Sequence, residues 1–106
     1  MIEDLSPLHI KKILDSGEKI RLIDVREVWE YEIARIENSE VMPLSEFEKH
    51  AGLLNQDDKI IVYCHRGVRS LRVCNYLVNA GFGNVINLKG GIYAWSMEVD
   101  NTIPVY

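Results

Sequence analysis

Residues 62–74, VYCHRGVRSLRVC, contain the side chains best suited to chemistry. Cys64 ends an apolar run that is typical of a strand, and a glycine and two arginines follow before a helical pattern begins. Gly67 permits a sharp bend, so the backbone amides of the loop can point inward. Inward amides, the N-terminus of the next helix and the charges of Arg66 and Arg69 all favour an anion, and the thiolate is the reactive form of cysteine. The pattern predicts an anionic sulfur nucleophile at Cys64.

An inert alternative stays open for these residues. A cysteine in such a strand is commonly a buried apolar side chain, and loop arginines can be plain surface charges. His65 could contact a substrate, but a histidine in an exposed loop is more often solvated. Cys74 lies at helical spacing with Leu71 and Leu77 on an apolar stripe, so we expect it to pack in the core.

The rest of the chain alternates between helical and strand-like patterns. Ser6 and Pro7 are typical of the first positions of a helix, which Gly17 ends. The apolar run 59–64 lacks polar alternation, which predicts a central parallel strand covered on both faces. The other predicted strands are residues 20–25, 41–42 and 84–88, and the other predicted helices are 27–35, 44–54 with Ser45 as its cap, 70–80 and 92–97.

Strands separated by helices with short connections predict an α/β fold with a mainly parallel sheet, flanked by helices and joined by right-handed crossovers. Ligands bind such sheets beyond the carboxyl ends of the strands, and Asp24 and Cys64 both stand at such ends. Asp24 and Arg26 are expected to support the loop through an ion pair and hydrogen bonds, or Asp24 simply caps the next helix.

Three further groups have structural expectations. The acidic clusters Glu27-Glu30-Glu32 and Glu46-Glu48 are expected to form solvated faces. Gly90-Gly91 is expected to let two stretches of backbone pass close together. Trp95 is expected to be a core side chain.

Length and composition restrict the function further. The 106 residues suit one domain over residues 1–106, and the net charge of −4 argues against a nucleic-acid partner. The acidic start lacks the pattern of a secretory signal, and no apolar stretch reaches membrane-spanning length. The two cysteines fit no common zinc spacing, so neither a metal nor a disulfide is expected. A cytoplasmic location follows as the expectation.

At these residues the sequence resembles the single-domain rhodanese-like sulfurtransferases. The resemblance rests on LIDVREVWEYEIARI at 22–36, Pro43-Leu44, KIIVYCHRGVRS at 59–70, GFGNVINLKGGIYAW at 81–95 and Pro104-Val105-Tyr106. It implies a parallel sheet of about five strands with helices on both faces.

The resemblance also implies a chemistry for Cys64. The thiolate would take a sulfane sulfur from thiosulfate or from a protein persulfide, become a persulfide itself, and pass the sulfur to cyanide or a thiol acceptor. No metal or organic cofactor, and no membrane, is implied. The implied substrate-binding residues are those of the loop, with Arg66 and Arg69 steering the anionic donor: His65, Arg66, Gly67, Val68, Arg69 and Ser70.

One segment departs from the family pattern. Where the family usually has Gly-His-Ile-Pro-Gly-Ala, this chain has residues 34–39, ARIENS. Asn38 can replace a glycine at a positive backbone angle, so we expect an altered turn.

Two other functions stay open from sequence. A cysteine phosphatase or arsenate reductase would use the same kind of loop, but only four residues separate Cys64 from Arg69, one fewer than in those enzymes. A rhodanese-like module could instead bind partners or relay sulfur without efficient turnover of thiosulfate. The presence of Cys64 weakens a purely structural role for such a module.

Overall fold

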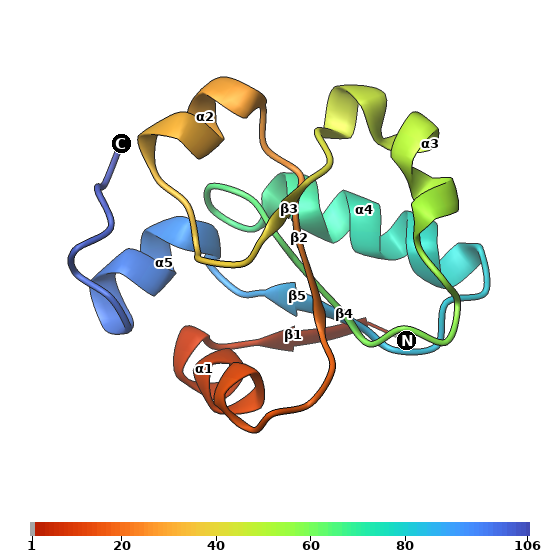
Figure 1. Ribbon diagram of the computed structural model, residues 1–106, viewed down its shortest axis with the longest axis horizontal. Helices are drawn as coiled ribbons and strands as arrows, with labels where there is room; N and C mark the ends of the chain where they lie inside the picture. Colours follow the sequence, from red (N-terminus) through yellow and green to blue (C-terminus); the bar gives the residue numbers. More distant parts are fainter. Residues whose placement is uncertain (1) are drawn as a thin grey trace.

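The computed structural model describes residues 2–106 and forms one sheet with helices around it (Figure 1). The strands are β1 (Ile2–Leu5), β2 (Arg21–Asp24), β3 (Glu40–Val41), β4 (Ile60–Tyr63) and β5 (Val85–Leu88). The helices are α1 (Pro7–Asp15), α2 (Val28–Ile33), η1 (Leu44–Glu46), α3 (Phe47–His50), η2 (Ala51–Leu53), α4 (Val68–Asn79) and α5 (Gly91–Glu98).

All five strands are parallel, in the order β1-β5-β4-β2-β3. The predicted α/β class and parallel sheet are therefore confirmed. β4 is the central strand, and all four of its residues are buried, as the apolar run predicted. The carboxyl ends of β4 and β2 lie side by side, with Asp24 paired to Tyr63. Cys64 and Asp24 consequently lie next to each other at the carboxyl ends of these strands.

β1 was not predicted. Glu3 and Asp4 are exposed, and the strand pairs along one side only, with Ile2 opposite Val85. Edge strands of this kind lack the continuous apolar run that marks a buried parallel strand. Its position depends on pairing with β5, which is more than 80 residues away in the chain.

Two apolar cores lie on the two faces of the sheet. One contains Val62, Cys64 and Cys74 with Phe47 and Leu77, and so packs α3 and α4 against the sheet. The other packs α1 and α5 against the opposite face through Ile10, Ile61, Tyr63, Ile92 and Trp95. Figure 1 shows α1 and α4 on opposite sides of the strands. The prediction of helices on both faces and of a buried Trp95 is confirmed.

The first helix, α1, begins where the sequence predicted it, whereas the predicted helix 44–54 differs from the structure. Ser6 caps α1, with its hydroxyl accepting the amide of His9 at 3.3 Å. The predicted helix 44–54 is instead three short turns, η1, α3 and η2, which keep the apolar side chains facing the core. The prediction of Ser45 as a cap is wrong, because its hydroxyl donates to the Glu27 carboxylate at 3.0 Å.

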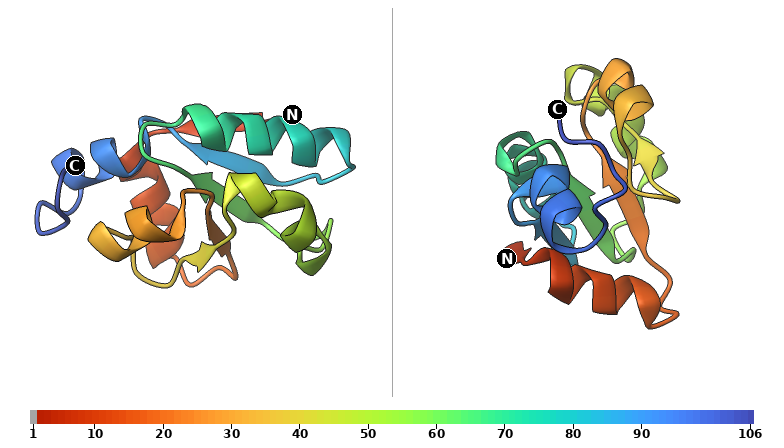
Figure 2. Two further views of the ribbon diagram at one scale, coloured as in Figure 1. Left: turned by 90° about the horizontal axis from the view of Figure 1, so that it is seen from above. Right: turned by 90° about the vertical axis from the view of Figure 1, so that its left-hand side faces the viewer.

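Within residues 2–106, no helix is both long and apolar enough to cross a membrane. The C-terminal segment after α5 runs back along the molecule and ends beside α2 (Figures 1 and 2). This return brings Tyr106 to the carboxyl end of β4, where Cys64 lies.

Candidate active site

Cys64 directly follows β4 and is 1% exposed. Its Sγ accepts the backbone amide of Gly67 at 3.1 Å and the hydroxyl of Ser70 at 3.4 Å. Gly67 has a φ of +97°, and a Cβ there would lie 3.2 Å from the amide nitrogen of Gly90. The sharp bend that the sequence predicted is therefore present, and it aims an amide at the sulfur.

α4 begins at Val68, two residues earlier than the predicted start at residue 70. The loop is consequently short, and its last residues already belong to the first turn of α4. Helix N-termini carry unpaired amides and partial positive charge, which favour an anion nearby. Val68 itself projects outward and is 72% exposed.

The first turn of α5 fixes the base of the loop. The amide of Ile92 donates to the carbonyl of Cys64 at 2.9 Å, and the amide of Tyr93 donates to the carbonyl of His65 at 3.0 Å. Gly91 makes this approach possible, because a Cβ there would lie 2.6 Å from the amide nitrogen of Arg66. The expectation that Gly90-Gly91 allows close backbone passage is confirmed.

Arg26 and Asp24 form a buried ion pair, with 2.7 Å between Arg26 Nη2 and Asp24 Oδ2. Arg26 also donates to the carbonyls of Glu30 and Ala34, at 3.3 and 2.6 Å, and to the hydroxyl of Tyr106 at 2.9 Å. Burial disfavours the charged form of Arg26, but the adjacent Asp24 carboxylate outweighs this and raises the pKa. The pair thus holds α2 and the C-terminal segment against β2.

Glu30 was expected to be solvated, and this expectation is wrong because the residue is only 4% exposed. Its carboxylate receives two bonds from Arg69, at 2.7 and 2.9 Å, and one from the Tyr106 hydroxyl at 2.7 Å. It also accepts the amide of Glu27 at 3.1 Å, which completes a capping box for α2. Burial would raise the pKa of Glu30, but these bonds outweigh it and lower the pKa to about 2.

The two loop arginines, Arg66 and Arg69, differ in whether they pair with Glu30. Arg69 is held by the Glu30 carboxylate, whose bonds raise the pKa of Arg69, so it links α2 to the loop. Arg66 forms no ion pair within residues 2–106, and its guanidinium lies 4.0 Å above the centre of the Tyr93 ring. Of the two side chains, Arg66 is therefore the one available to an anionic ligand.

The sequence left two readings of His65 open, a substrate contact and a solvated side chain. In the structure its ring stacks on Tyr106, with 4.1 Å between ring centres and 15° between ring planes. Its Nε2 is buried and has no hydrogen-bond partner in the part of the chain that the structure describes. Burial, and then the charge of Arg66, lower the pKa of His65. The sequence contained no local signal for this contact, because Tyr106 is 41 residues away from His65 along the chain.

Cys74 lies on the face of α4 that packs into the core, and it is fully buried, as predicted. Burial, together with the charges of Asp4 and Cys64, raises the pKa of Cys74 to about 12. The thiol of Cys74 is therefore protonated at neutral pH, and only thiolates are efficient nucleophiles.

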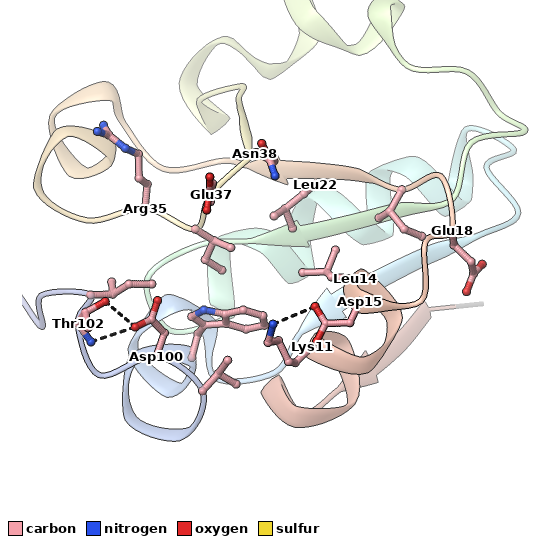
Figure 3. Close-up of a pocket in the computed structure, with 15 residues that line it drawn as sticks. Lys11, Leu14, Asp15, Glu18, Leu22, Arg35, Glu37, Asn38, Asp100 and Thr102 are labelled. Atoms are coloured by element: carbon pink, nitrogen blue, oxygen red, sulfur yellow. Dashed lines mark hydrogen bonds and ion pairs between the residues drawn. The ribbon is translucent and has the colours of Figure 1, made fainter.

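A cleft of about 730 Å³ lies away from the Cys64 loop (Figure 3). It lies between α1, α5 and the segment 35–38, and its polar lining mixes both signs of charge, including the ion pair of Lys11 with Asp15. Asn38 borders it with a φ of +67°, so the positive backbone angle predicted for this residue is confirmed.

Among the described residues, no group of three or more histidine, cysteine, aspartate or glutamate side chains is arranged to hold a metal ion.

The family described as Rhodanese-like domain matches residues 6–98. The probable adenylyltransferase/sulfurtransferase MoeZ of Mycobacterium tuberculosis is 36% identical over 104 residues, which cover 96% of this chain and 26% of that protein. The putative sulfur carrier protein YrkF of Bacillus subtilis is 39% identical over 99 residues, covering 93% of this chain and 54% of that protein. The chain thus spans between about a quarter and about half of these relatives.

A crystal structure of a rhodanese-like domain protein from Staphylococcus aureus superimposes with a TM-score of 0.84 at 24% identity, covering 98% of both chains. At that identity the likeness shows the fold. With the family match, it is clear that the chain belongs to the rhodanese-like domain family. Of the two relatives, one is named as a sulfurtransferase and the other as a sulfur carrier.

Proposed function

We propose that the protein is a sulfurtransferase that carries a sulfane sulfur as a persulfide on Cys64. The observation that carries the proposal is the position of Sγ, which accepts the amide of Gly67 and the hydroxyl of Ser70 at the N-terminus of α4. Donors placed in this way stabilise negative charge on the thiolate and on the terminal sulfur of the persulfide.

The reaction needs two displacements. With thiosulfate, the Cys64 thiolate attacks the outer sulfur, a new S–S bond forms, and sulfite leaves with the electron pair of the broken bond. An acceptor nucleophile, cyanide or a thiolate, then attacks the terminal sulfur, and Cys64 leaves as the thiolate. A protein persulfide can replace thiosulfate in the first step, with its own thiolate as the leaving group. Neither displacement requires a metal or an organic cofactor.

The loop residues have separate roles in this proposal. Arg66 attracts the anionic donor, while the peptide groups of His65, Gly67, Val68 and Ser70 form the rim around the sulfur. Arg69 acts through its bonds to Glu30, so it closes the loop and does not bind the donor. Asp24 and Arg26 support the bonds around Glu30, because Arg26 pairs with Asp24 and also donates to Tyr106. We further propose that residues 1–106 act as one domain in the cytoplasm.

A sulfur relay is a second candidate, in which both donor and acceptor are proteins. The names of the relatives favour it, since one is called a sulfur carrier and the other combines sulfurtransferase with adenylyltransferase. The persulfide on Cys64 is common to both candidates.

Intact-mass spectrometry tests the proposal directly. After thiosulfate, the protein should gain one sulfur atom, and cyanide should remove it. Cys64→Ser should gain none, whereas the matched Cys74→Ser should behave like the unchanged protein, because the Cys74 thiol is buried and protonated. A gain only from a protein persulfide would identify the relay. Sulfur gained by Cys64→Ser, or no gain from any donor, would refute the assignment.

A further inference from the structure

A shallow groove of about 390 Å³ runs beside the Cys64 loop, on the side of β1 and β5. Cys64 is not among its lining residues, so the groove is separate from the groups that bond to Cys64 Sγ. Its walls come from three parts of the chain that are distant in sequence: the loop with α4, β1 near its carboxyl end, and the end of β5 with its connection to α5. We call it the basic groove, and the residues that matter here are Asp4, Arg66, Val68, Leu71, Arg72 and Lys89.

Positive charge predominates in the basic groove. Arg66, Arg72 and Lys89 border it, and within residues 2–106 none of them pairs with a carboxylate. Asp4 is the carboxylate in its lining, and it is already engaged by the Asn87 side-chain amide at 3.0 Å. This concentration of cations contrasts with the net charge of −4 for the whole chain. The groove therefore favours an acidic ligand, although the chain as a whole carries a net negative charge.

The basic groove is larger and more apolar than a small inorganic anion needs. Its volume is that of roughly thirteen water molecules at about 30 Å³ each. Two apolar side chains stand among the cations, Val68 at 72% and Leu71 at 38% exposure. A groove lined by both apolar and cationic side chains suits a polypeptide segment with acidic and apolar side chains.

A hydrogen-bonded path connects the basic groove to the sulfur. Asn87 is buried at its floor, and its amide bonds both to Asp4 and to the carbonyl of Gly67, the latter at 3.5 Å. The amide of the same Gly67 donates to Cys64 Sγ. A ligand in the groove therefore rests on the residue that holds the sulfur.

We propose that the basic groove docks an acidic, extended segment of the protein that exchanges sulfur with Cys64. The inference rests on the proposed function, and it identifies the partner as an acidic polypeptide held beside the loop. Docking there places the partner's reacting group next to Cys64 and raises its effective concentration.

The test uses a hexaglutamate peptide with blocked ends as the probe, titrated into the ¹⁵N-labelled protein and followed by NMR. Amide shifts should be largest at residues 66–72 and 87–90, and they should extend to Cys64 through Gly67. The dissociation constant should rise steeply with salt, because the contacts are exposed charges. Shifts centred elsewhere, or an affinity insensitive to salt, would overturn the proposal.

Two double variants distinguish binding in the basic groove from a general effect of net charge. Arg72→Glu with Lys89→Glu should weaken peptide binding by about tenfold or more. The control, Lys12→Glu with Lys49→Glu, changes two exposed lysines on α1 and α3, and so produces the same net charge. Equal weakening in both double variants would mean that only total charge matters, and the proposal would be wrong.

Two further outcomes would also overturn it. Equal shifts at similar affinity from inorganic phosphate would mean a small-anion site. An oligothymidylate that bound the groove as well as the peptide did would indicate a nucleic-acid surface.

The proposed function is tested separately in the same variants. Sulfur gain from thiosulfate should be unchanged in Arg72→Glu with Lys89→Glu, because neither side chain bonds to Cys64. If the unchanged protein gains no sulfur from any donor, the proposed function fails irrespective of the peptide result. If it gains sulfur but does not bind the peptide, only the docking proposal fails.

Discussion

Arg26 places a full positive charge in the interior of a small protein, next to the strand that carries Asp24. Such burial is tolerated because every nitrogen of the guanidinium has a partner: Asp24, two carbonyls of α2 and its C-terminal flank, and Tyr106. Removing one member of a buried ion pair leaves the other charge without compensation. The ion pair of Arg26 with Asp24 is present, and Arg26 is linked to the loop through Glu30 and Tyr106.

Arg26→Ala should lower the free energy of unfolding by about 3–5 kcal/mol, because Asp24 would remain buried and unpaired. Urea unfolding followed by circular dichroism measures this loss. The matched control is Arg35→Ala, an exposed arginine whose removal should cost less than about 0.5 kcal/mol. Similar stabilities for the two variants would contradict the supporting role of Arg26.

At the level of elements, α2, the Cys64 loop and the C-terminal segment meet at a single carboxylate. Glu30 caps the N-terminus of α2, pairs with Arg69 from the start of α4, and accepts the hydroxyl of Tyr106. Tyr106 in turn stacks on His65. Local capping and long-range anchoring thus use the same side chain, so α2 cannot move without disturbing the loop.

Glu30→Gln should lower the free energy of unfolding by about 2 kcal/mol, because the charged bonds to Arg69 become neutral ones. It should also slow persulfide formation on Cys64, since Arg69 would no longer be held. Stopped-flow kinetics with thiosulfate measure the rate, and Glu32→Gln on the exposed side of α2 is the control. An unchanged rate in Glu30→Gln would show that Arg69 needs no anchor.

A second prediction concerns the contact between the start of α5 and the Cys64 loop. Gly91→Ala should destabilise the protein by about 2 kcal/mol or more, because its φ of +65° is unfavourable for alanine and the new Cβ would collide with the backbone of His65 and Arg66. Gly83→Ala, where a Cβ meets nothing within 4 Å, is the control and should be nearly neutral. Thermal unfolding compares the two, and equal melting temperatures would disprove the close approach.

Across the whole molecule, the network around Glu30 makes stability depend on pH. The pKa of Glu30 is lowered from 4.5 to about 2 by folding, so the unfolded chain binds more protons at this residue between those values. Stability from Glu30 is therefore complete above about pH 4.5 and is lost as the pH falls toward 2.

Unfolding of the unchanged protein and of Glu30→Gln, measured at several pH values, tests this dependence. The stability difference between them should be largest above about pH 4.5 and should shrink as the pH falls toward 2. Comparing the two proteins removes the contribution of the other carboxylates. A difference that stayed constant with pH would mean that Glu30 titrates normally in the folded protein.

The sequence by itself determined the features that depend on neighbouring residues. The apolar run before Cys64 predicted a buried central strand, because such a strand has no polar face. Gly67 and Asn38 were identified from their ability to adopt positive φ angles, and both do so. The spacing of Cys74 along its helix predicted a buried thiol. In each case the physical cause acts within a few residues of the chain.

Only the tertiary structure decided which partners the charged and aromatic side chains found. Glu30 was expected to be solvated, yet it meets Arg69 and Tyr106, which are 39 and 76 residues away. The edge strand β1, the stacking of His65 on Tyr106 and the basic groove likewise join distant segments. A helical pattern gives the direction of a side chain, but burial and pairing depend on what the fold places opposite it.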